Sequence, residues 1–534
     1  MLNKSLLEGN VEFQSILEKL KDNPNDWTIQ RDMVMVIASL ESESLIDEAI
    51  KIASEISEGV VEMWKKSLDQ FHGKDIQNQN KKEEVTKESS FHVTEDEIVE
   101  QIYRDGKCLF LVYNKNTEEI KETKTFEDDK CIIKPLSGRE IENETIKLPS
   151  GTAEYRSTTE LLDEIKKHLS RYVDVSDKYL TIASCYVLVT WLYDKFQTIP
   201  YLRALGDTGC GKSRFLNVVG GLCYKPMLIS GAVTTSPIFR IIERWGGTFI
   251  IDEADMKSSD LYNGIINILN CGFEKGKNVT RADSNNHTGY FFYKVYCPKL
   301  LATRRDFDDK ALESRCLTEV MRETNRDDIP FVLNKRFHEE QEKLRNKLLL
   351  YRFNKYFKID PDDEAKVGLT NIEPRLQQIS HSMLIILADE ENSLSEFKAY
   401  LSEHQQEVIK ERSTTIEGQV IQTLFMKKSL VEPFNSNGTE FLPISSKDIA
   451  DELKQNQGLD SIDAIKVGKI LKGLGISTKS VRIPEQDKTK RCVIYDENRF
   501  KNLGKRYIWK DDTDSDSVSL VSSVSSVTGN TGKD

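Results

Sequence analysis

Residues 201–218 read YLRALGDTGCGKSRFLNV, and this stretch decides the fold. The apolar run YLRAL predicts a buried strand, and RFLNVVGGL predicts the helix that follows it. Between them, residues 206–213 (GDTGCGKS) match the pattern G-x-x-x-x-G-K-[ST]. Glycines let a backbone wrap closely around a phosphate, and a helix N-terminus adds a field that favours anions. The stretch therefore predicts a phosphate-binding loop at the end of a strand.

The side chains of this loop indicate a nucleotide as the ligand. In the pattern, the lysine reaches the β- and γ-phosphates of a bound nucleotide, and the hydroxyl that follows binds Mg²⁺. We therefore expect Lys212 to act on the phosphates of ATP as a catalytic residue, and Ser213 to bind Mg²⁺. A chance glycine-rich turn is the alternative, which the strand–loop–helix context disfavours. The expected nucleotide contacts are Gly206, Asp207, Thr208, Gly209, Cys210, Gly211, Lys212, Ser213 and Arg214.

An acidic pair follows a second apolar run further along the chain. The run TFII (248–251) is followed directly by Asp252 and Glu253. Beside a phosphate loop, the first carboxylate is placed to hold Mg²⁺ and the second to polarise the attacking water as a catalytic residue. An ordinary solvated turn is the alternative. The string DEAD (252–255) does not indicate a DEAD-box RNA helicase, because the S-A-T and H-R-x-G-R motifs are absent from the sequence.

Two further apolar runs, PMLIS (226–230) and KLLAT (299–303), alternate with helical segments. Such alternation predicts a parallel α/β sheet whose ligand chemistry lies at the strand ends. Thr303 ends the second run, and we expect its hydroxyl to sense the γ-phosphate and to position the water as a catalytic residue. A purely structural threonine is the alternative. Arg304 and Arg305 follow it directly.

The order of these motifs resembles that of the AAA+ ATPases. The phosphate loop, the acidic pair and the strand that ends at Thr303 are followed by an L-x-S-R segment at 312–315. The resemblance implies that Arg315 is an arginine finger, which completes the site of a neighbouring subunit and stabilises transferred charge. Arg375, in NIEPRLQQI (371–379), matches the second sensor of the family and is expected to contact the nucleotide. For both arginines, a structural role stays the alternative.

A β-rich insertion lies between the acidic pair and the strand that ends at Thr303. The runs NVTRA (278–282) and GYFFYKVY (289–296), joined by DSNNHT, predict a hairpin. It resembles the pre-sensor-1 hairpin of minichromosome maintenance and superfamily 3 helicases, which projects into the channel of a ring and touches DNA. Lysine and arginine can grip the phosphates of any sequence, although a solvated hairpin is the alternative. The expected nucleic-acid contacts are Lys275, Lys277, Arg281 and Lys294.

Residues 445–510 predict a helix, a turn, a second helix and two short strands. Ser446 is expected to cap the first helix, and VRI and RCVIY form the strands. The segment carries 15 Lys and Arg against 9 Asp and Glu, a net charge of +6 that suits contact with DNA. The pattern resembles a winged helix. Such domains dock either DNA or protein, and the sequence leaves both open.

The whole chain is nevertheless acidic. It has 75 Lys and Arg against 87 Asp and Glu, a formal net charge of −12, which excludes a uniformly basic coat protein for nucleic acid. The cysteines form no C-x-x-C pair and the histidines no H-E-x-x-H, so no zinc site is predicted. No apolar run suits a membrane span, and the stretch from Tyr179 to Phe196 is interpreted as a buried helix. The opening MLNKSLLEGNVEF lacks an apolar signal core, so we expect a cytoplasmic protein.

We therefore expect an α/β fold built on a P-loop AAA+ core, with an N-terminal helical arm, a small β-subdomain and a C-terminal winged-helix domain. The expected parts are a helical N-terminal region and linker (1–90), a β-rich subdomain (91–155), the ATPase core (156–330), a helical lid and connector (331–440), the winged helix (441–510) and a disordered acidic, Ser-rich tail (511–534).

From 156 to 508 the chain resembles helicase-like ATPases of archaeal, phage and mobile genetic elements. The resemblance implies an ATP-hydrolysing, ring-forming motor, a hexamer, that works as a DNA helicase or translocase in the replication of a mobile element, virus or plasmid. A primase or another replication protein is an expected partner. Two alternatives stay open: a remodeller or loader of a protein partner, and a nucleotide-dependent DNA-binding regulator that does not unwind. Residues 231–247 lack the aromatic-glycine loop of protein-threading rings, which disfavours the remodeller.

Overall fold

A computed structural model describes most of the 534-residue chain. The described residues are 7, 10–38, 40, 43–57, 59–61, 85–128, 131–229, 235–252, 260–282, 290–363, 369, 372–457, 459, 461–483 and 488–508. Four expectations concern residues outside these ranges: the catalytic role of Glu253, the turn 283–288, the linker over 73–84 and the acidic tail from 511.

The phosphate loop leaves a five-stranded parallel sheet at the carboxyl end of β8. The strand order is β14-β8-β13-β10-β9, so β13 lies between β8 and β10. Because all five strands run the same way, their carboxyl ends share one edge of the sheet. The strands are β8 (Tyr201–Leu205), β9 (Met227–Ile229), β10 (Phe249–Ile251), β13 (Lys299–Thr303) and β14 (Cys316–Val320).

Four of these strands confirm the sequence predictions, and β14 was not predicted. It pairs only with β8, at the border of the sheet. Cys316 and Leu317 are buried, whereas the side chain of Val320 is 61% exposed. An edge strand that is buried over only two residues shows too short an apolar run to stand out in the sequence.

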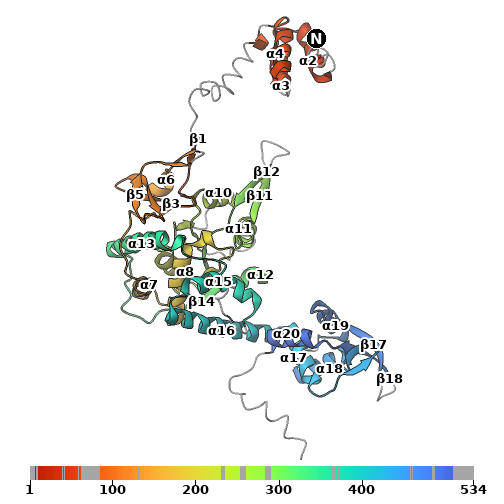
Figure 1. Cartoon of the computed structure of the whole chain (residues 1–534). Helices are drawn as coiled ribbons and strands as arrows, with labels where there is room; N and C mark the ends of the chain where they lie inside the picture. Colours follow the sequence, from red (N-terminus) through yellow and green to blue (C-terminus); the bar gives the residue numbers. More distant parts are fainter. Residues whose placement is uncertain are drawn as a thin grey trace, which may run out of the picture. The chain divides into compact units, whose positions relative to one another are not determined.

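Helices pack around this sheet (Figure 1). Ser157 caps the first of them, α7, because its hydroxyl accepts the backbone N–H of Glu160 at 3.1 Å, as the S-x-x-E pattern predicts. The second, α8, is almost entirely buried, and it ends at Thr190 rather than at the predicted Phe196. The helices are α7 (Thr158–Tyr172), α8 (Asp177–Thr190), α9 (Lys212–Gly220), α10 (Thr235–Trp245), α11 (Asp260–Cys271), α12 (Lys310–Glu313), α13 (Lys335–Tyr356), α15 (Pro374–Leu387) and α16 (Glu391–Thr414).

The chain after α8 turns into a short 3-10 helix, η1 (Tyr193–Lys195), which explains the early end. The carboxylate of Asp194 in this turn accepts two hydrogen bonds from the guanidinium of Arg352, at 2.8 and 2.9 Å. A carboxylate held by both arms of an arginine fixes the backbone that carries it. This tertiary contact is invisible in the local helical pattern.

A small antiparallel sheet precedes these helices and the five-stranded sheet in the sequence. Its order is β2-β3-β4-β5. The short helix α6 (Arg139–Glu142) comes later in the chain, before α7. The strands are β2 (Phe91–Val93), β3 (Glu97–Arg104), β4 (Lys107–Asn114) and β5 (Ile120–Thr123). The β-rich character that the sequence predicts for this region is confirmed.

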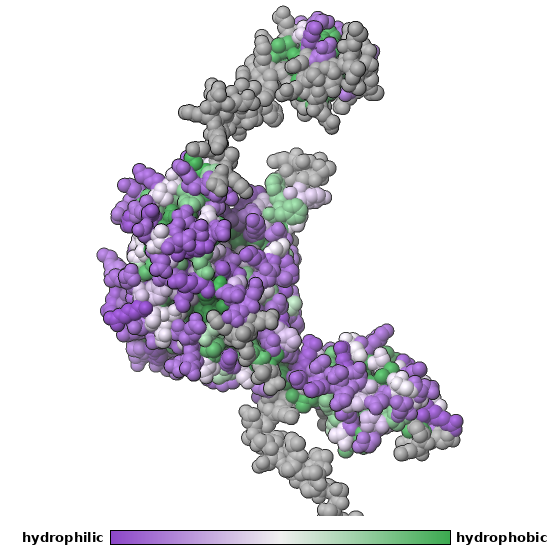
Figure 2. All heavy atoms as spheres, in the orientation of Figure 1, coloured by the Kyte–Doolittle hydropathy of each residue, from purple (hydrophilic) through white to green (hydrophobic). Residues whose placement is uncertain are grey.

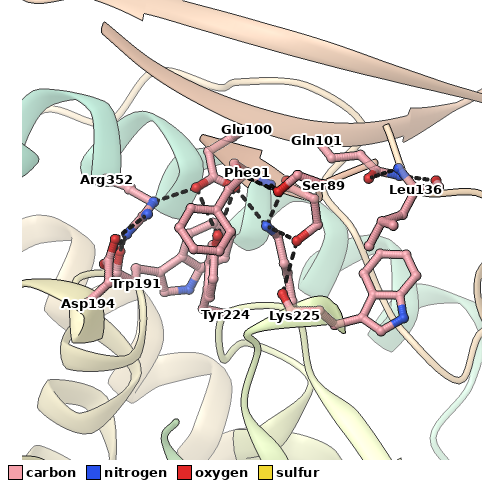
Figure 3. Close-up of polar contacts among 12 residues, drawn as sticks. Ser89, Phe91, Glu100, Gln101, Leu136, Trp191, Asp194, Tyr224, Lys225 and Arg352 are labelled. Carbon is pink, nitrogen blue, oxygen red and sulfur yellow. Dashed lines mark hydrogen bonds and ion pairs between the residues drawn. The ribbon is translucent and has the colours of Figure 1, made fainter. Parts of the chain in front are cut away.

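A buried network of charges joins this small sheet to the core (Figure 3). The carboxylate of Glu100 on β3 accepts hydrogen bonds from Arg352 at 2.7 Å and from Tyr224 at 2.8 Å, and it pairs with Lys225 at 3.0 Å. Glu100 and Lys225 are 1% exposed and Arg352 is fully buried. Burial lowers the pKa of Lys225 to about 8, and the charge of Glu100 opposes that shift. With Asp194 included, the network contains two positive groups, Arg352 and Lys225, and two negative groups, Glu100 and Asp194, so its charges balance.

The contacts divide the chain into two units, Met1–Glu88 with Thr125–Lys134, and Ser89–Lys124 with Pro135–Asp534. Within its described residues, the first unit contains three helices with an apolar core of their own and a sheet of order β1-β7-β6. Its β1 occupies residues that the sequence assigned to a linker, because the polar segment VTKE pairs through its backbone with β7. The elements are α2 (Val11–Asp22), α3 (Trp27–Ala38), α4 (Glu43–Ser54), β1 (Val85–Glu88), β6 (Phe126–Asp128) and β7 (Cys131–Lys134).

The C-terminal elements enclose a separate apolar core. Two predicted helices, α18 and α19, and two predicted strands, β17 and β18, are present in the predicted order. The cap of α18 is Ser445 rather than Ser446, because Ser445 and Asp448 exchange hydrogen bonds from backbone N–H to side chain, at 2.6 and 3.2 Å. The elements are α17 (Ile416–Lys428), β15 (Phe434–Ser436), β16 (Thr439–Leu442), α18 (Ser446–Gln457), α19 (Ala464–Gly473), β17 (Thr478–Ile483), β18 (Lys488–Ile494) and α20 (Glu497–Tyr507).

Within the described ranges, none of the helices combines the length and the apolarity that crossing a membrane demands.

The substitution Glu100→Gln tests the buried network. It keeps the size of the side chain and leaves two buried cations with a single carboxylate, so we expect the free energy of unfolding to fall by about 3 kcal/mol. Urea denaturation followed by circular dichroism measures the loss. Glu122→Gln is the matched control, because Glu122 pairs with Arg104 on the same sheet with 42% of its side chain exposed. We expect the control to cost less than about 1 kcal/mol, and equal losses would contradict the importance of the network.

Candidate functional site

The phosphate loop adopts a backbone that only glycine accommodates easily. Gly209 and Gly211 have φ of +91° and +92°, in the region that other residues avoid. A Cβ on Gly206 would lie 2.6 Å from the carbonyl oxygen of Met321, which follows β14. A side chain would therefore strain the backbone at Gly209 and Gly211 and would clash with Met321 at Gly206, and this explains the glycine pattern that the sequence shows.

Lys212 begins α9 and turns back over the loop. Its ammonium donates hydrogen bonds to the carbonyl oxygens of Gly206 at 2.7 Å and of Asp207 at 2.6 Å. The residue is 7% exposed. The loop thus holds a single positive charge at its centre, beside the N-terminal N–H groups of α9, where an anion is stabilised.

Ser213 and Asp252 meet across the edge of the sheet. The Ser213 hydroxyl donates a hydrogen bond of 2.6 Å to Oδ2 of Asp252. Both side chains line a pocket of about 290 Å³, whose other lining residues are Thr208, Gly209, Gly211, Lys212, Arg214 and Arg304. A hydroxyl and a carboxylate are hard oxygen ligands of the kind that Mg²⁺ takes together with phosphate oxygens and water. The donor set therefore fits Mg²⁺.

Two polar residues lie at the end of β13, and only one of them lines the pocket. Thr303, the residue expected to sense phosphate, is fully buried, and its hydroxyl has no hydrogen-bond partner within the described residues. Arg304, the next residue, lines the pocket. Neighbouring residues of a strand point to opposite sides, so the side chain that shares the pocket with Lys212 is Arg304. No role was predicted for Arg304 from the sequence, although its place directly after a strand end was the available signal.

Arg214, an expected nucleotide contact, also lines the pocket. Its guanidinium donates to the carbonyl oxygen of Pro330 at 2.6 Å and to that of Tyr172 at 3.4 Å. These bonds tie the segment after β14 and the end of α7 to the first turn of α9. The position of Arg214 thus depends on two segments far away in the sequence.

The two candidate arginines, Arg315 and Arg375, lie together but outside the lining of this pocket. Their guanidinium carbons lie 5.3 and 4.5 Å from the centre of one ring, that of Phe273. Such an arrangement holds a cation over the negative face of an aromatic ring. Arg315 also donates to the side-chain oxygen of Asn270. Burial, together with the charge of Arg315, lowers the pKa of Arg375. Phe273 could not be predicted from the sequence as the ring that holds both arginines, because no local pattern marks it.

The predicted hairpin is confirmed as β11 (Asn278–Ala282) paired antiparallel with β12 (Tyr290–Lys294). Three of the four expected nucleic-acid contacts are engaged within the chain. Lys275 donates to the carbonyl oxygen of Asp194 at 2.9 Å. Lys277 pairs with Glu274 at 2.6 Å, and the guanidinium of Arg281 lies 5.3 Å from the centre of the Phe239 ring.

Lys294, the fourth expected contact, ends β12 with an exposed side chain. Its backbone N–H donates to Glu243 of α10 at 3.3 Å. The hairpin is therefore anchored beside α10 and carries one outward lysine. The structure brings Lys212, Ser213 and Asp252 into one pocket, and it leaves the four hairpin cations and the two candidate arginines elsewhere.

Substitution of Arg304 tests the pocket directly. Arg304→Ala removes a guanidinium that lines it, so we expect roughly tenfold or greater weakening of tripolyphosphate binding, the cost of a charge-assisted hydrogen bond. Isothermal titration calorimetry measures the affinity. Arg305→Ala is the matched control, since Arg305 is exposed and does not line the pocket. Equal effects of the two substitutions would show that only the general positive charge matters.

No protein-family model and no curated protein matches this chain. Among solved structures, it is similar to the ligand-free C-terminal region of NrS-1, with 11% identity and a TM-score of 0.36 over 74% of this chain and 96% of that one. It is also similar to SCCmec type IV Cch, described as an active helicase, with 10% identity and a TM-score of 0.38 over 80% and 82%. The ORC1 protein of Aeropyrum pernix in complex with DNA gives 14% identity and a TM-score of 0.19 over 64% and 96%. Likenesses this low do not assign an activity to the chain.

Proposed function

We propose that the chain is an ATP-hydrolysing AAA+ motor that acts on DNA. The observation that carries the proposal is the hydrogen bond of 2.6 Å between Ser213 and Asp252 at the mouth of the glycine loop. A hydroxyl at the end of a phosphate loop and a carboxylate at the end of a neighbouring strand are the pair that holds the metal of a nucleoside triphosphate in P-loop enzymes. The pocket is also lined by Lys212, Arg214 and Arg304, which provide three positive charges.

Four residues that line the pocket, and Glu253 outside the described residues, have definite tasks in this proposal. Lys212 exchanges the carbonyl oxygens of its own loop for the β- and γ-phosphates of ATP. Ser213 and Asp252 hold Mg²⁺, which neutralises phosphate charge when it is bound. Arg304 approaches the terminal phosphate from the end of β13. Glu253 orients the water that attacks this phosphate.

Thr303 has a smaller part than the sequence analysis expected. Its hydroxyl is buried and does not line the pocket, while its carbonyl oxygen accepts the backbone N–H of Gly206 at 3.1 Å. We propose that Thr303 holds the beginning of the phosphate loop against β13. A shift of the phosphate bound in the pocket would then displace β13 through this contact.

Arg315 and Arg375 act in this proposal on the nucleotide of a neighbouring subunit. Both guanidinium groups lie on Phe273, outside the pocket of their own chain. A ring of subunits, which we expect to be a hexamer, would place them at the pocket next door, where they stabilise charge on the transferred phosphoryl group.

We propose that the motor moves DNA in the replication of a mobile element, virus or plasmid, together with a primase or another replication protein. The hairpin and the basic C-terminal segment support contact with nucleic acid, and the latter is proposed to be a winged helix. The +6 charge of residues 445–510 favours a polyanion over a protein partner. A strand-displacement assay with and without ATP distinguishes a helicase from a regulator that hydrolyses ATP on DNA without unwinding.

The substitution Glu253→Gln tests the assignment of hydrolysis. The amide can no longer polarise water, so we expect ATP to bind with unchanged affinity while DNA-stimulated hydrolysis falls by roughly 100-fold or more. A phosphate-release assay measures turnover. Glu274→Gln is the control, because Glu274 pairs with Lys277 away from the pocket. Retained turnover in the Glu253 variant would contradict the assignment.

A mixing experiment tests the action of Arg315 between subunits. Lys212→Ala and Arg315→Ala should each abolish hydrolysis, and a mixture of the two proteins should regain part of it. The reason is that some interfaces then combine an intact loop from one subunit with an intact arginine from the next. A mixture of the Lys212→Ala and Glu253→Gln proteins is the control and should stay inactive, since neither protein contributes a site with both Lys212 and Glu253 intact. Absence of recovery in the first mixture would refute action between subunits.

A further inference from the structure

The hairpin exposes two large aromatic rings on one face. Tyr290 and Phe292 on β12 are 64% and 63% exposed. Apolar side chains gather on the hairpin in the surface view (Figure 2). Clustered exposure of large apolar side chains marks interaction sites on soluble proteins, so this face is a candidate interaction site.

The alternation of the strand divides the hairpin into two faces. Tyr290, Phe292 and Lys294 share the first, because they are two residues apart. The second face, with Phe291 and Tyr293, turns toward α10, where the Tyr293 ring lies 4.4 Å from that of Phe239. Tyr293 is therefore packed against its own chain, Phe291 beside it is still 48% exposed, and the first face is the more exposed of the two.

The charges and the pairing of β11 complete the first face. Thr280 lies opposite Phe292, and Asn278 lies opposite Lys294, and both are exposed. Lys294 is the single member of the four expected cations that lies on this face. The face thus offers two rings, one positive charge and two small polar side chains.

These features fit one kind of partner. Side chains on the same face of a strand are about 6.6 Å apart along the chain, whereas stacked bases repeat every 3.4 Å. Two rings can therefore each receive a base only from a strand that is unpaired and stretched. Aromatic platforms with a nearby cation bind single strands of any sequence, because every base has a π-face.

We propose that Tyr290 and Phe292 stack on the bases of single-stranded nucleic acid and that Lys294 contacts a phosphate. This inference rests on the proposed function and deepens it: it identifies the single-stranded form as the substrate and base stacking as the means of holding it. It also moves the contact from Lys275, Lys277 and Arg281 to the aromatic face, which keeps Lys294, since the other three cations are engaged within the chain.

Two oligonucleotides of equal length test the proposal, one of thymidylate and one of abasic sites. Both carry the same phosphates, and only the first carries bases. With the full chain in a fluorescence anisotropy assay, we expect tighter binding of thymidylate than of the abasic strand. The double variant Tyr290→Ala/Phe292→Ala should weaken thymidylate binding roughly tenfold or more and leave binding of the abasic strand unchanged.

Two further variants serve as controls. Phe291→Ala removes a ring from the same strand on the opposite face, and it should keep the preference for thymidylate. Tyr290→Trp/Phe292→Trp keeps two aromatic platforms and should also keep it, which separates stacking from disturbance of the hairpin fold.

Equal losses on both oligonucleotides, or no loss on either, would overturn the proposal. A changed oligomeric state in sedimentation with unchanged thymidylate affinity would overturn it as well, because the face would then be covered by a second copy of the chain. Wild-type protein that hydrolyses ATP but binds neither oligonucleotide would refute DNA as the substrate of the motor. If the aromatic variants alone do not show the expected effect, the stacking proposal is wrong and the proposed function is unaffected.

Discussion

The candidate site depends on one constraint, the shared carboxyl edge of a five-stranded parallel sheet. Because β13 lies between β8 and β10, three strand ends converge on one pocket. Ser213 and Asp252 are 39 positions apart in the chain and yet form a hydrogen bond of 2.6 Å. Contacts within a single helix or strand could not bring these two side chains together. The register of parallel strands fixes it, and the backbone hydrogen bonds of the sheet maintain that register.

A second constraint is the balance of buried charge around Glu100. The carboxylate receives Arg352 from α13, Tyr224 and Lys225 from the chain before β9, and it lies itself on the small sheet (Figure 3). Buried ions that are completely paired add little net stability, but they penalise every arrangement that separates them. The network therefore selects one placement of the small sheet on the core. It also fixes the turn at Asp194, where helix α8 gives way to η1.

The net charge of the chain says little about contact with DNA, because the charge is distributed unevenly. A net charge of −12 does not prevent contact with a polyanion, because interactions of exposed charges fade within about a Debye length. The cations of the hairpin region, however, are largely used inside the chain, by Glu274, Phe239 and the carbonyl oxygen of Asp194. In our proposal the hairpin, which has few available cations and three exposed rings, holds a strand by stacking on two of them, Tyr290 and Phe292. Stacking responds less to salt than phosphate contacts do.

The sequence by itself determined the phosphate loop, four of the five strands of its sheet, the hairpin and the two helices and two strands of the C-terminal segment. These features are local, since glycine conformations, a strand that ends in an acidic residue and helix caps are set by neighbouring residues. Only the tertiary structure decided that Arg304 rather than Thr303 lines the pocket, that Arg315 and Arg375 share the ring of Phe273, and that β14 completes the sheet. Each of these depends on packing between segments far apart in the chain, which no sequence window contains.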